Sequence, residues 1–351
     1  MKKVMIGMSG GVDSSVAAAL LKKEGYEVTG ATMRLWKYPE NEKSIDKEIA
    51  NAKRVCDFLG IEHIVLDFSE QFRETVVKNF IEEYANGRTP NPCIVCNKRL
   101  KFGLMFDRAM EMGMDYIATG HYARIEKRTD GYHLLMSGAA SKDQSYVLYN
   151  FTQEVLSKTI MPLEGYTKDE VRTLAEELNI PAKEAPESME ICFVPNDDYK
   201  TFLTEYAGLT PKEGDMLDYN GNVIGRHTGV MNYTIGQRKG IGAYGRPMFV
   251  MKINPLDNTV TLGEKGMEFF GELTAKDLNV ISGGELPERI TAKVRYQAKP
   301  AWAEVRTEGA TVYVRFDEPQ RAVTSGQAIV FYDGNEVLGG ATVCEAQPIA
   351  L

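Results

Sequence analysis

The sequence predicts an α/β protein in which a helix-covered parallel sheet comes first, a small central module second and an antiparallel β-barrel last. Short apolar runs alternate with helical patterns over the first 119 residues, which is typical of a parallel sheet. From residue 271 onward the pattern is β: polar and apolar residues alternate along 311–316, and Asp333-Gly334 between two apolar runs indicates a hairpin. A chain of 351 residues is also long for one core. We therefore expect an α/β domain at 1–202, a small central domain at 203–270 and a barrel at 271–351.

Hydrophobic periodicity predicts the elements of the amino-terminal part. Strands are expected at 3–8, 27–33, 62–67 and 115–119. Helices are expected at 13–24, 46–59, 69–85 and 97–112. Thr167-Lys168-Asp169-Glu170 forms a capping-box pattern that opens one more helix, and we interpret it as structural. In parallel sheets ligands bind at the carboxyl ends of the strands, so functional residues are expected there.

Composition indicates an ordinary globular protein, with 43% hydrophobic and 26% charged residues. No run of about 18 apolar residues occurs, so no membrane helix is expected. The apolar run behind Lys2 and Lys3 is too short for a secretion signal, and a cytoplasmic location is the default expectation. The five cysteines, an odd and sparse set, argue for metal or redox chemistry rather than a disulfide framework.

The formal net charge of −8 by itself argues against nucleic-acid binding. Residues 84–106 and 226–252, however, contain no Asp or Glu and carry several Lys and Arg side chains. Local basic zones on an acidic protein can hold a phosphate backbone. Taken alone, such windows are better explained as solvated loops.

The strongest motif is Ser9-Gly10-Gly11-Val12-Asp13-Ser14-Ser15, which follows the first expected strand and opens the first helix. The glycines allow a sharp turn with exposed amide groups, and a helix amino terminus favours an anion. The Lys-Ser/Thr ending of a Walker loop is absent, and phosphates would repel Asp13 unless Mg²⁺ bridges them. The motif resembles the loop of the ATP-pyrophosphatase (PP-loop) superfamily, which cleaves ATP between the α- and β-phosphates and adenylates a substrate oxygen. The alternative is a glycine-rich turn without a ligand.

Two cysteine-containing segments are the next candidates. Cys93 and Cys96 form a CxxC pair, and Cys192 follows in an apolar segment expected to be strand-like. We place Cys96 at the start of a helix, where the helix dipole and nearby cations would lower its pKa. The residues alone equally allow two loop thiols and one buried core cysteine.

Seven strings taken together resemble the tRNA 2-thiouridylase (MnmA/TrmU) family over essentially the whole chain. In order, they are SGGVDSS, TPNPCIVCNKRLKFG, ATGHYAR, KDQSYVLY, ICFV, TIGQRKG and SGQAIVFY. The family has a PP-loop domain, a small central domain and a carboxyl-terminal β-barrel. It converts the wobble uridine of the Glu, Gln and Lys tRNAs to 2-thiouridine. ATP adenylates the C2 oxygen with release of pyrophosphate, and sulfur then displaces AMP.

The resemblance implies a role for each matching residue. Cys96 would be the nucleophile, Cys192 the persulfide carrier, and Asp13 a catalytic ligand of ATP-Mg²⁺. ATP contacts are implied for Gly7, Met8, Ser9, Gly10, Gly11, Val12, Asp13, Ser14, Met33 and Gly120. tRNA contacts are implied for Asn91, Pro92, Cys93, His121, Lys142, Asp143, Gln144, Arg295, Tyr296 and Gln327. On the residues alone, His121 is equally a satisfied histidine at a strand end, and Arg295-Tyr296 equally a barrel surface pair.

Cys93 departs from many family members, which carry Asp at this position. Cys93, Cys96 and Cys192 would supply three thiolates, enough to hold a 4Fe-4S cluster with one iron open for sulfide. Zinc at the same residues would block the sulfur chemistry. A cluster-bound sulfide and a protein persulfide are therefore two open routes, while Cys56 and Cys344 are interpreted as structural.

Two other functions stay open from the sequence. A PP-loop enzyme acting on a small molecule would need neither the CxxC with Cys192 nor a carboxyl-terminal β module. A non-catalytic RNA-binding protein would need neither the intact phosphate loop nor paired thiols. We expect a monomer that binds the anticodon stem-loop of one tRNA, with no membrane association, and that receives sulfur from a cysteine desulfurase directly or through relay proteins.

Overall fold

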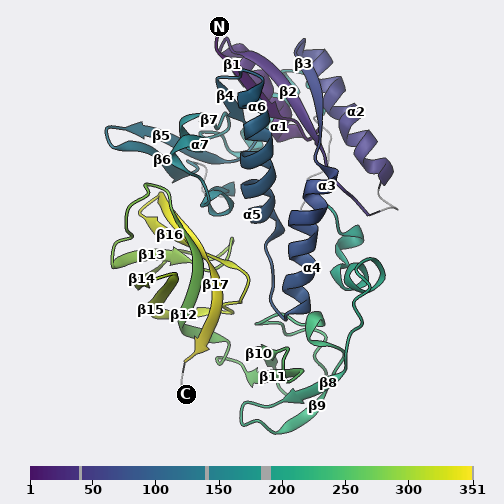
Figure 1. The fold of residues 1–351 in the computed structure, drawn as a ribbon, viewed down its shortest axis with the longest axis vertical. Helices are drawn as coiled ribbons and strands as arrows, with labels where there is room; N and C mark the ends of the chain where they lie inside the picture. Colours follow the sequence, from purple (N-terminus) through teal and green to yellow (C-terminus); the bar gives the residue numbers. More distant parts are fainter. Residues whose placement is uncertain (39–41, 139–141, 183–190, 350–351) are drawn as a thin grey trace.

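The computed structural model describes residues 1–38, 42–138, 142–182 and 191–349 (Figure 1). The amino-terminal part is built on a five-stranded parallel sheet with the strand order β3-β2-β1-β4-β7. Its strands are β1 (Lys3–Gly7), β2 (Glu27–Arg34), β3 (Glu62–Asp67), β4 (Tyr116–Ala118) and β7 (Thr159–Ile160). The central residues of β1 and β2 are buried, as expected for parallel strands that helices cover on both faces. The four predicted strands are confirmed with small shifts at their ends.

Helices flank this sheet and continue below it in Figure 1. They are α1 (Val12–Lys23), α2 (Glu42–Leu59), α3 (Ser69–Phe72), α4 (Lys78–Ala85), α5 (Pro92–Cys96), α6 (Met105–Glu111), α7 (Gln153–Ser157), α8 (Lys168–Glu177) and α9 (Tyr199–Thr201). The π-helical segment Arg73–Val77 joins α3 to α4, and Asn97–Leu104 joins α5 to α6. The predicted capping box at the start of α8 is present. In the part of the chain that the structure describes, no helix has the length and apolar character to cross a membrane.

The helix predicted at 97–112 begins five residues earlier, at Pro92. The Asn91 side chain accepts a hydrogen bond from the amide of Ile94, and proline at the first helical position has no amide to leave unpaired. This places Cys96 in the second turn of a continuous helix instead of at its start.

The central module is a four-stranded sheet with the order β10-β11-β8-β9 and an apolar core of its own. Its strands are β8 (Gly214–Leu217), β9 (Val223–His227), β10 (Met248–Asn254) and β11 (Thr259–Glu264).

The carboxyl-terminal part is a closed antiparallel barrel, because β12 pairs with both β15 and β17. Its strands are β12 (Phe269–Val280), β13 (Arg289–Lys293), β14 (Ala301–Glu308), β15 (Thr311–Arg321), β16 (Ala328–Asp333) and β17 (Glu336–Pro348). The predicted Asp333-Gly334 hairpin joins β16 to β17, and Gly334 adopts a φ of 58°, which glycine tolerates at no steric cost. The predicted alternation along 311–316 is confirmed by alternating burial in β15.

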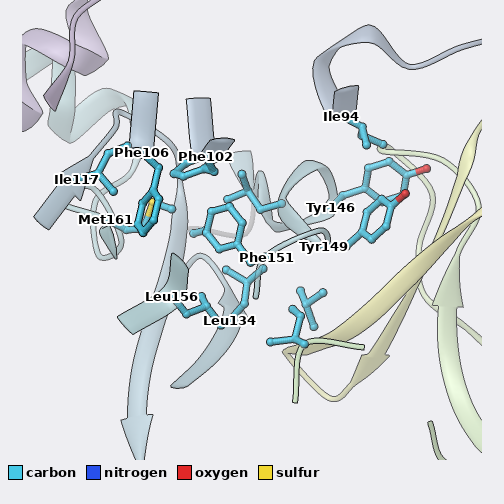
Figure 2. Packing of buried hydrophobic residues seen from close by; sticks show 14 of the residues in the cluster. Ile94, Phe102, Phe106, Ile117, Leu134, Tyr146, Tyr149, Phe151, Leu156 and Met161 are labelled. Atoms are coloured by element: carbon cyan, nitrogen blue, oxygen red, sulfur yellow. The ribbon is translucent and has the colours of Figure 1, made fainter. Parts of the chain in front are cut away.

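A hairpin from the amino-terminal part extends the barrel sheet, which the sequence does not predict. Strands β5 (Ala123–Arg128) and β6 (Gly131–Met136) form this hairpin, and β6 pairs with the start of β17. One apolar cluster consequently runs from Met5 and Ile117 of the parallel sheet to Val330 and Tyr332 of the barrel. Figure 2 shows its middle, where Phe102, Phe106 and Phe151 lead across to Tyr146 and Tyr149 beside the barrel strands.

An ion-pair network closes the seam between the hairpin and β17. Glu336 accepts from Arg128 Nη1 at 2.6 Å, and its other oxygen lies 2.6 Å from His133 Nδ1. Desolvation lowers the pKa of His133, but hydrogen bonds with Glu336 and Asp130 outweigh it, so the pKa is raised above 6.5. A raised folded-state pKa means that the imidazolium stabilises the fold fully below about pH 6.5 and loses this contribution as pH rises through the folded-state value.

We expect His133→Asn to lower the free energy of unfolding by on the order of 1 kcal/mol at pH 5.5, because it removes a charge-assisted hydrogen bond. The difference from the wild type should shrink as the pH rises above the folded-state pKa. Thermal unfolding between pH 5 and 9 measures both. A difference that does not vary with pH would contradict this assignment.

Candidate active site

The predicted phosphate loop lies between β1 and α1. Ser9 and Ser14 tie it together: the Ser9 amide donates to Ser14 Oγ at 3.2 Å, and the Gly11 amide donates to Ser9 Oγ at 3.3 Å. Gly10 has a φ of 76°, and a Cβ there would lie 3.0 Å from the backbone of Glu48 in α2. The loop therefore needs glycine and presents the amino terminus of α1, an arrangement that favours an anion.

The other residues with implied ATP contacts lie on the same edge of the sheet. Gly7 ends β1, Met33 is near the end of β2, and Gly120 comes two residues after β4. β1 is the central neighbour of both other strands. Gly120 approaches the loop so closely that a Cβ would lie 2.8 Å from the Ser14 amide nitrogen. The carboxyl ends of three adjacent strands thus gather the predicted nucleotide residues.

Asp13, the second residue of α1, has two partners that sequence reasoning missed. Tyr122 Oη donates to its Oδ1 at 2.7 Å, and Lys168 Nζ donates to the same oxygen at 2.5 Å. The signal for Lys168 was present in the sequence, since it is the first residue of the capping-box helix that we interpreted as purely structural. Lys168 thus supplies a positive charge at Asp13, where we expected only Mg²⁺. Oδ2 accepts no hydrogen bond from the described residues, so Asp13 also fits a magnesium ligand.

The structure brings Cys96 and Cys192 to one region. Cys96 is buried in an apolar cluster that also contains Phe193, the residue after Cys192. The charges of Cys96 and Cys93 both act on Cys192, so the three thiols are electrostatic neighbours. The strand-like conformation expected around Cys192 is wrong: residues 191–194 form a turn, with the Val194 amide donating to the Ile191 carbonyl at 3.0 Å.

The predicted lowering of the Cys96 pKa is also wrong. Burial raises the pKa of Cys96, and the nearby charge of Lys101 only partly opposes this. Cys96 lies in the second turn of its helix, beyond the free amide groups of the amino terminus, so the dipole does not compensate. Cys192 keeps an exposed surface, but the protein around it displaces enough water that desolvation raises its pKa to about 12.

The three-cysteine ligand set does not fit a metal site in this conformation. Within residues 1–38, 42–138, 142–182 and 191–349, no three His, Cys, Asp or Glu side chains are arranged to hold a metal ion. Cys93, Cys96 and Cys192 therefore lie near one another without forming a preformed cluster site.

The barrel holds the strip Asn91-Pro92-Cys93 in place. Gln327 Nε2 donates to the carbonyls of Thr89 and Pro90 at 2.9 and 3.0 Å, and the Thr89 amide donates to Ser325. Asn91 caps α5 and Pro92 is buried, whereas Cys93 is exposed. The structure thus gives Gln327 a protein partner, and its tRNA contact stays a prediction.

Other residues with implied tRNA contacts are similarly engaged. Arg295 donates to the carbonyl of Ala322 and to Thr324 Oγ1 at 2.8 and 2.6 Å, and desolvation lowers its pKa. Tyr296 is 38% exposed, and its pKa is raised by desolvation and, to a smaller degree, by Asp143 and Cys93, so it lies near both.

The segment Lys142-Asp143-Gln144 contacts the turn after β4. Asp143 is buried and accepts hydrogen bonds from Ser137 and Ser145, while Gln144 Oε1 accepts from the Tyr122 amide at 3.0 Å. Lys142 is partly exposed. His121 is buried and hydrogen-bonded to Thr119 at 2.7 Å, and desolvation holds its pKa well below 6.5. His121 is therefore a neutral, internally bonded imidazole in this state.

Comparison with known families agrees with this architecture. The model described as tRNA methyl transferase HUP domain matches residues 2–196. The tRNA methyl transferase PRC-barrel domain matches 200–264, and the aminomethyltransferase beta-barrel domain matches 270–343.

The family models are named after methyltransferases, whereas the full-length relatives are named 2-thiouridylases. The tRNA-specific 2-thiouridylase MnmA of Clostridioides difficile (strain 630) is 48% identical over 97% of this chain and 98% of that protein. The proteins of the same name from Clostridium botulinum (strain Alaska E43 / Type E3) and Carboxydothermus hydrogenoformans are each 49% identical, again over 97% of this chain. This chain belongs to the tRNA-specific 2-thiouridylase family. The family and the fold predicted from the resemblance are therefore confirmed.

Similarity to solved structures is much lower. The U34-tRNA thiolase NcsA from Methanococcus maripaludis, solved with its [4Fe-4S] cluster, is 22% identical with a TM-score of 0.37. It aligns over 60% of this chain and 65% of that chain, and a likeness at this level says nothing about a cluster here.

We expect Gly120→Ala to weaken ATP binding about tenfold or more, because its Cβ would press on the backbone of Asp13 and Ser14 at 3.0 and 2.8 Å. Calorimetric titration with ATP-Mg²⁺ measures this. Gly165→Ala is the matched control, since no atom lies within 4 Å of its Cβ. Unchanged affinity in Gly120→Ala would show that this approach does not shape the nucleotide site.

We expect alkylation of Cys192 by iodoacetamide to rise about tenfold per pH unit from pH 7 to 10 without levelling off, because a thiol of pKa about 12 is still mostly protonated there. Peptide mass spectrometry measures the rate. Lys101→Ala should slow it further, since the charge of Lys101 lowers the pKa of Cys192. A plateau below pH 9 would contradict the raised pKa.

Proposed function

We propose that this protein catalyses ATP-dependent 2-thiolation of the wobble uridine in the Glu, Gln and Lys tRNAs. One observation carries the proposal: β2 connects the phosphate edge of the sheet to the thiols. Met33, near its end, packs against the apolar cluster that contains Cys96, and the charge of Lys37 just beyond it acts on Cys192. Relatives that match almost the whole chain are named tRNA-specific 2-thiouridylase MnmA.

In the first reaction, the C2 oxygen of uridine attacks the α-phosphorus of ATP. The bond to the bridging oxygen breaks, and pyrophosphate leaves with the electron pair. The amides of the Ser9–Ser14 loop and the amino terminus of α1 would hold the phosphates, and Mg²⁺ bound with ATP at Asp13 would neutralise charge. The close approach of Gly120 supports a rigid loop, which keeps these donors aligned.

In the second reaction, a cysteine desulfurase or its relay proteins load Cys192 as a persulfide. The terminal sulfur attacks C2, and AMP leaves with the former C2 oxygen. The Cys96 thiolate then attacks Cys192 Sγ, so that a Cys96–Cys192 disulfide forms and the electrons of the broken S–S bond stay on the 2-thio group. A dithiol reductant restores both thiols. The electrostatic coupling of the two thiols supports this pairing, and Lys101 favours the thiolate of each.

The anticodon stem-loop would approach where the barrel meets α5, so that the extruded uridine reaches the Asn91–Cys93 strip. A cleft of about 330 Å³ lies here between α4–α5 and the barrel, and its walls include Asn91, Arg88 and Lys276. In the zone 226–252, Arg226 and Arg246 already pair with Asp215 and Glu264 on the exposed surface. Arg88 of the zone 84–106 is likewise paired, with Glu83, so ion pairs do not distinguish the two zones. We favour the zone 84–106 as the principal backbone contact because it lines this cleft and carries the Asn91–Cys93 strip.

The iron route needs the cysteines in a different arrangement from the one described, which is why the persulfide route is our proposal. The small-molecule alternative is disfavoured because the strip that presents Cys93 is held by a barrel such an enzyme would not need. Monomeric state and a cytoplasmic site of action remain part of this proposal.

We expect enzyme purified anaerobically to form 2-thiouridine from unmodified Glu tRNA, ATP-Mg²⁺, cysteine, a cysteine desulfurase and a dithiol reductant equally well with and without added iron. Mass spectrometry of digested tRNA measures the product. Thiolation that occurs only after iron loading would contradict the persulfide route and support a cluster-bound sulfide. With a cysteine desulfurase and cysteine as the sulfur source, Cys192→Ser should lose thiolation by at least a hundredfold yet still release pyrophosphate when tRNA is added.

Cys344→Ser, in a barrel strand, is the control and should thiolate normally. Pyrophosphate release that does not depend on tRNA would favour a small-molecule substrate. No AMP and no pyrophosphate with tRNA and ATP would favour a non-catalytic RNA-binding protein.

A further inference from the structure

The phosphate loop carries no cation of its own. Between Gly7 and Ser15 the one charged side chain is the carboxylate of Asp13. ATP brings several further negative charges to this place, and neutralising them by backbone amides alone leaves Asp13 as a repulsive neighbour. A positive side chain from elsewhere in the fold is therefore required, or the loop depends wholly on the magnesium that ATP carries.

Lys168 meets this requirement. Its Nζ lies 2.5 Å from Asp13 Oδ1, and its side chain is 13% exposed against 29% for Asp13. Tyr122 donates to the same oxygen, so the carboxylate is held from two sides at the amino terminus of α1. The ammonium group therefore already lies where the phosphates of a bound nucleotide must arrive.

The backbone of Lys168 is held rigidly, whereas its side chain is flexible. Thr167 and Glu170 form the reciprocal capping box, with the Thr167 amide donating to Glu170 Oε2 at 2.7 Å. Val171 and Ala175 pack α8 into the cluster that contains Val16 of α1. The base of the lysine is thus fixed relative to the loop, while its four-carbon stem can carry the charge a few ångströms between acceptors.

We propose that Lys168 is the phosphate-binding cation of the nucleotide site: it neutralises Asp13 while the loop is empty and binds the pyrophosphate moiety once ATP-Mg²⁺ occupies the loop. This inference deepens the proposed function and rests on it for the reaction. During adenylation the ammonium stays protonated and stabilises the charge that develops on the leaving pyrophosphate as the bond to the α-phosphorus breaks. No redox partner or additional proton acceptor is needed.

The two members of the ion pair should have opposite effects on a free phosphate ligand. The probe is inorganic pyrophosphate in metal-free buffer, titrated calorimetrically into the full-length protein. Lys168→Met should weaken its binding at least tenfold, because the cation is lost and Asp13 is left bare. Asp13→Asn should strengthen its binding several-fold, because the repulsive charge is gone and Asp13 no longer neutralises Lys168. If Lys168 only positions Asp13 structurally, both variants will weaken binding or leave it unchanged, and the proposal is wrong.

Two variants separate this effect from a general loss of folding. Lys168→Arg keeps the charge and should bind pyrophosphate within about threefold of the wild type. Lys23→Met removes an exposed lysine at the far end of α1 and should bind normally. If Lys168→Met does not fold, the contrast between Asp13→Asn and Lys168→Arg still decides: weaker binding by Asp13→Asn overturns the proposal.

Kinetics on the same variants separate this proposal from the proposed function. In tRNA-dependent pyrophosphate release, Lys168→Met should lower kcat by a hundredfold or more even at saturating ATP-Mg²⁺, whereas a positioning role would change mainly KM. If the wild type releases pyrophosphate and Lys168→Met releases it equally fast, the proposed role of Lys168 is wrong while the proposed function stands. Failure of the wild type to release pyrophosphate with tRNA would sink the proposed function, while the calorimetric result would still decide whether Lys168 binds phosphate.

Discussion

One apolar core shared by the parallel sheet and the barrel is the constraint on which the site depends. Because the cluster from Met5 to Tyr332 is continuous, the barrel cannot change its position without opening that core. The barrel loop around Gln327 is therefore held at a fixed place against the strip that carries Cys93. The barrel strand β17 also packs tightly against the amino-terminal part, since a Cβ at Gly340 would lie 2.6 Å from the ring of Tyr149. The third part of the chain thus shapes the candidate active site as well as extending its surface.

Charge at the site is balanced in pairs contributed by distant segments. Asp13 meets Lys168, which is 155 residues away in the sequence, and the thiols of Cys96 and Cys192 meet the charge of Lys101. The fold brings Lys168 to Asp13 and Cys192 to Lys101, whereas Cys96 and Lys101 are near neighbours on one continuous helix. The resting site consequently pairs the carboxylate of Asp13 and holds few thiolates, which limits unwanted oxidation or alkylation before the substrates are bound.

The sequence predicts those parts of the fold that depend on local periodicity. Four of the five strands of the parallel sheet, the capping box at Thr167 and the Asp333-Gly334 hairpin could be predicted from neighbouring residues alone. It does not predict the β5–β6 hairpin on the barrel, because that pairing depends on a strand 200 residues later. The prediction of a lowered pKa for Cys96 is wrong for a related reason. The helix was predicted to start five residues too late, and the spacing of residues does not reveal that distant aromatic residues such as Phe193 bury this thiol. The sequence analysis did not predict the contact of Lys168 with Asp13, because the capping box already gave this segment a sufficient local explanation.

The burial of the thiols argues for an order of events. A persulfide and a thiolate in the same site would react with one another before any uridine is activated, if both were freely ionised. Raised pKa values at Cys96 and Cys192 keep the resting pair protonated. The exposed Cys93 and the 38% exposed Tyr296 mark the side from which a base could enter. A base inserted there would lie beside Cys93 on α5. Because the resting thiols are protonated, they are weak nucleophiles before the uridine is adenylated, so adenylation before sulfur transfer is the order that this arrangement favours.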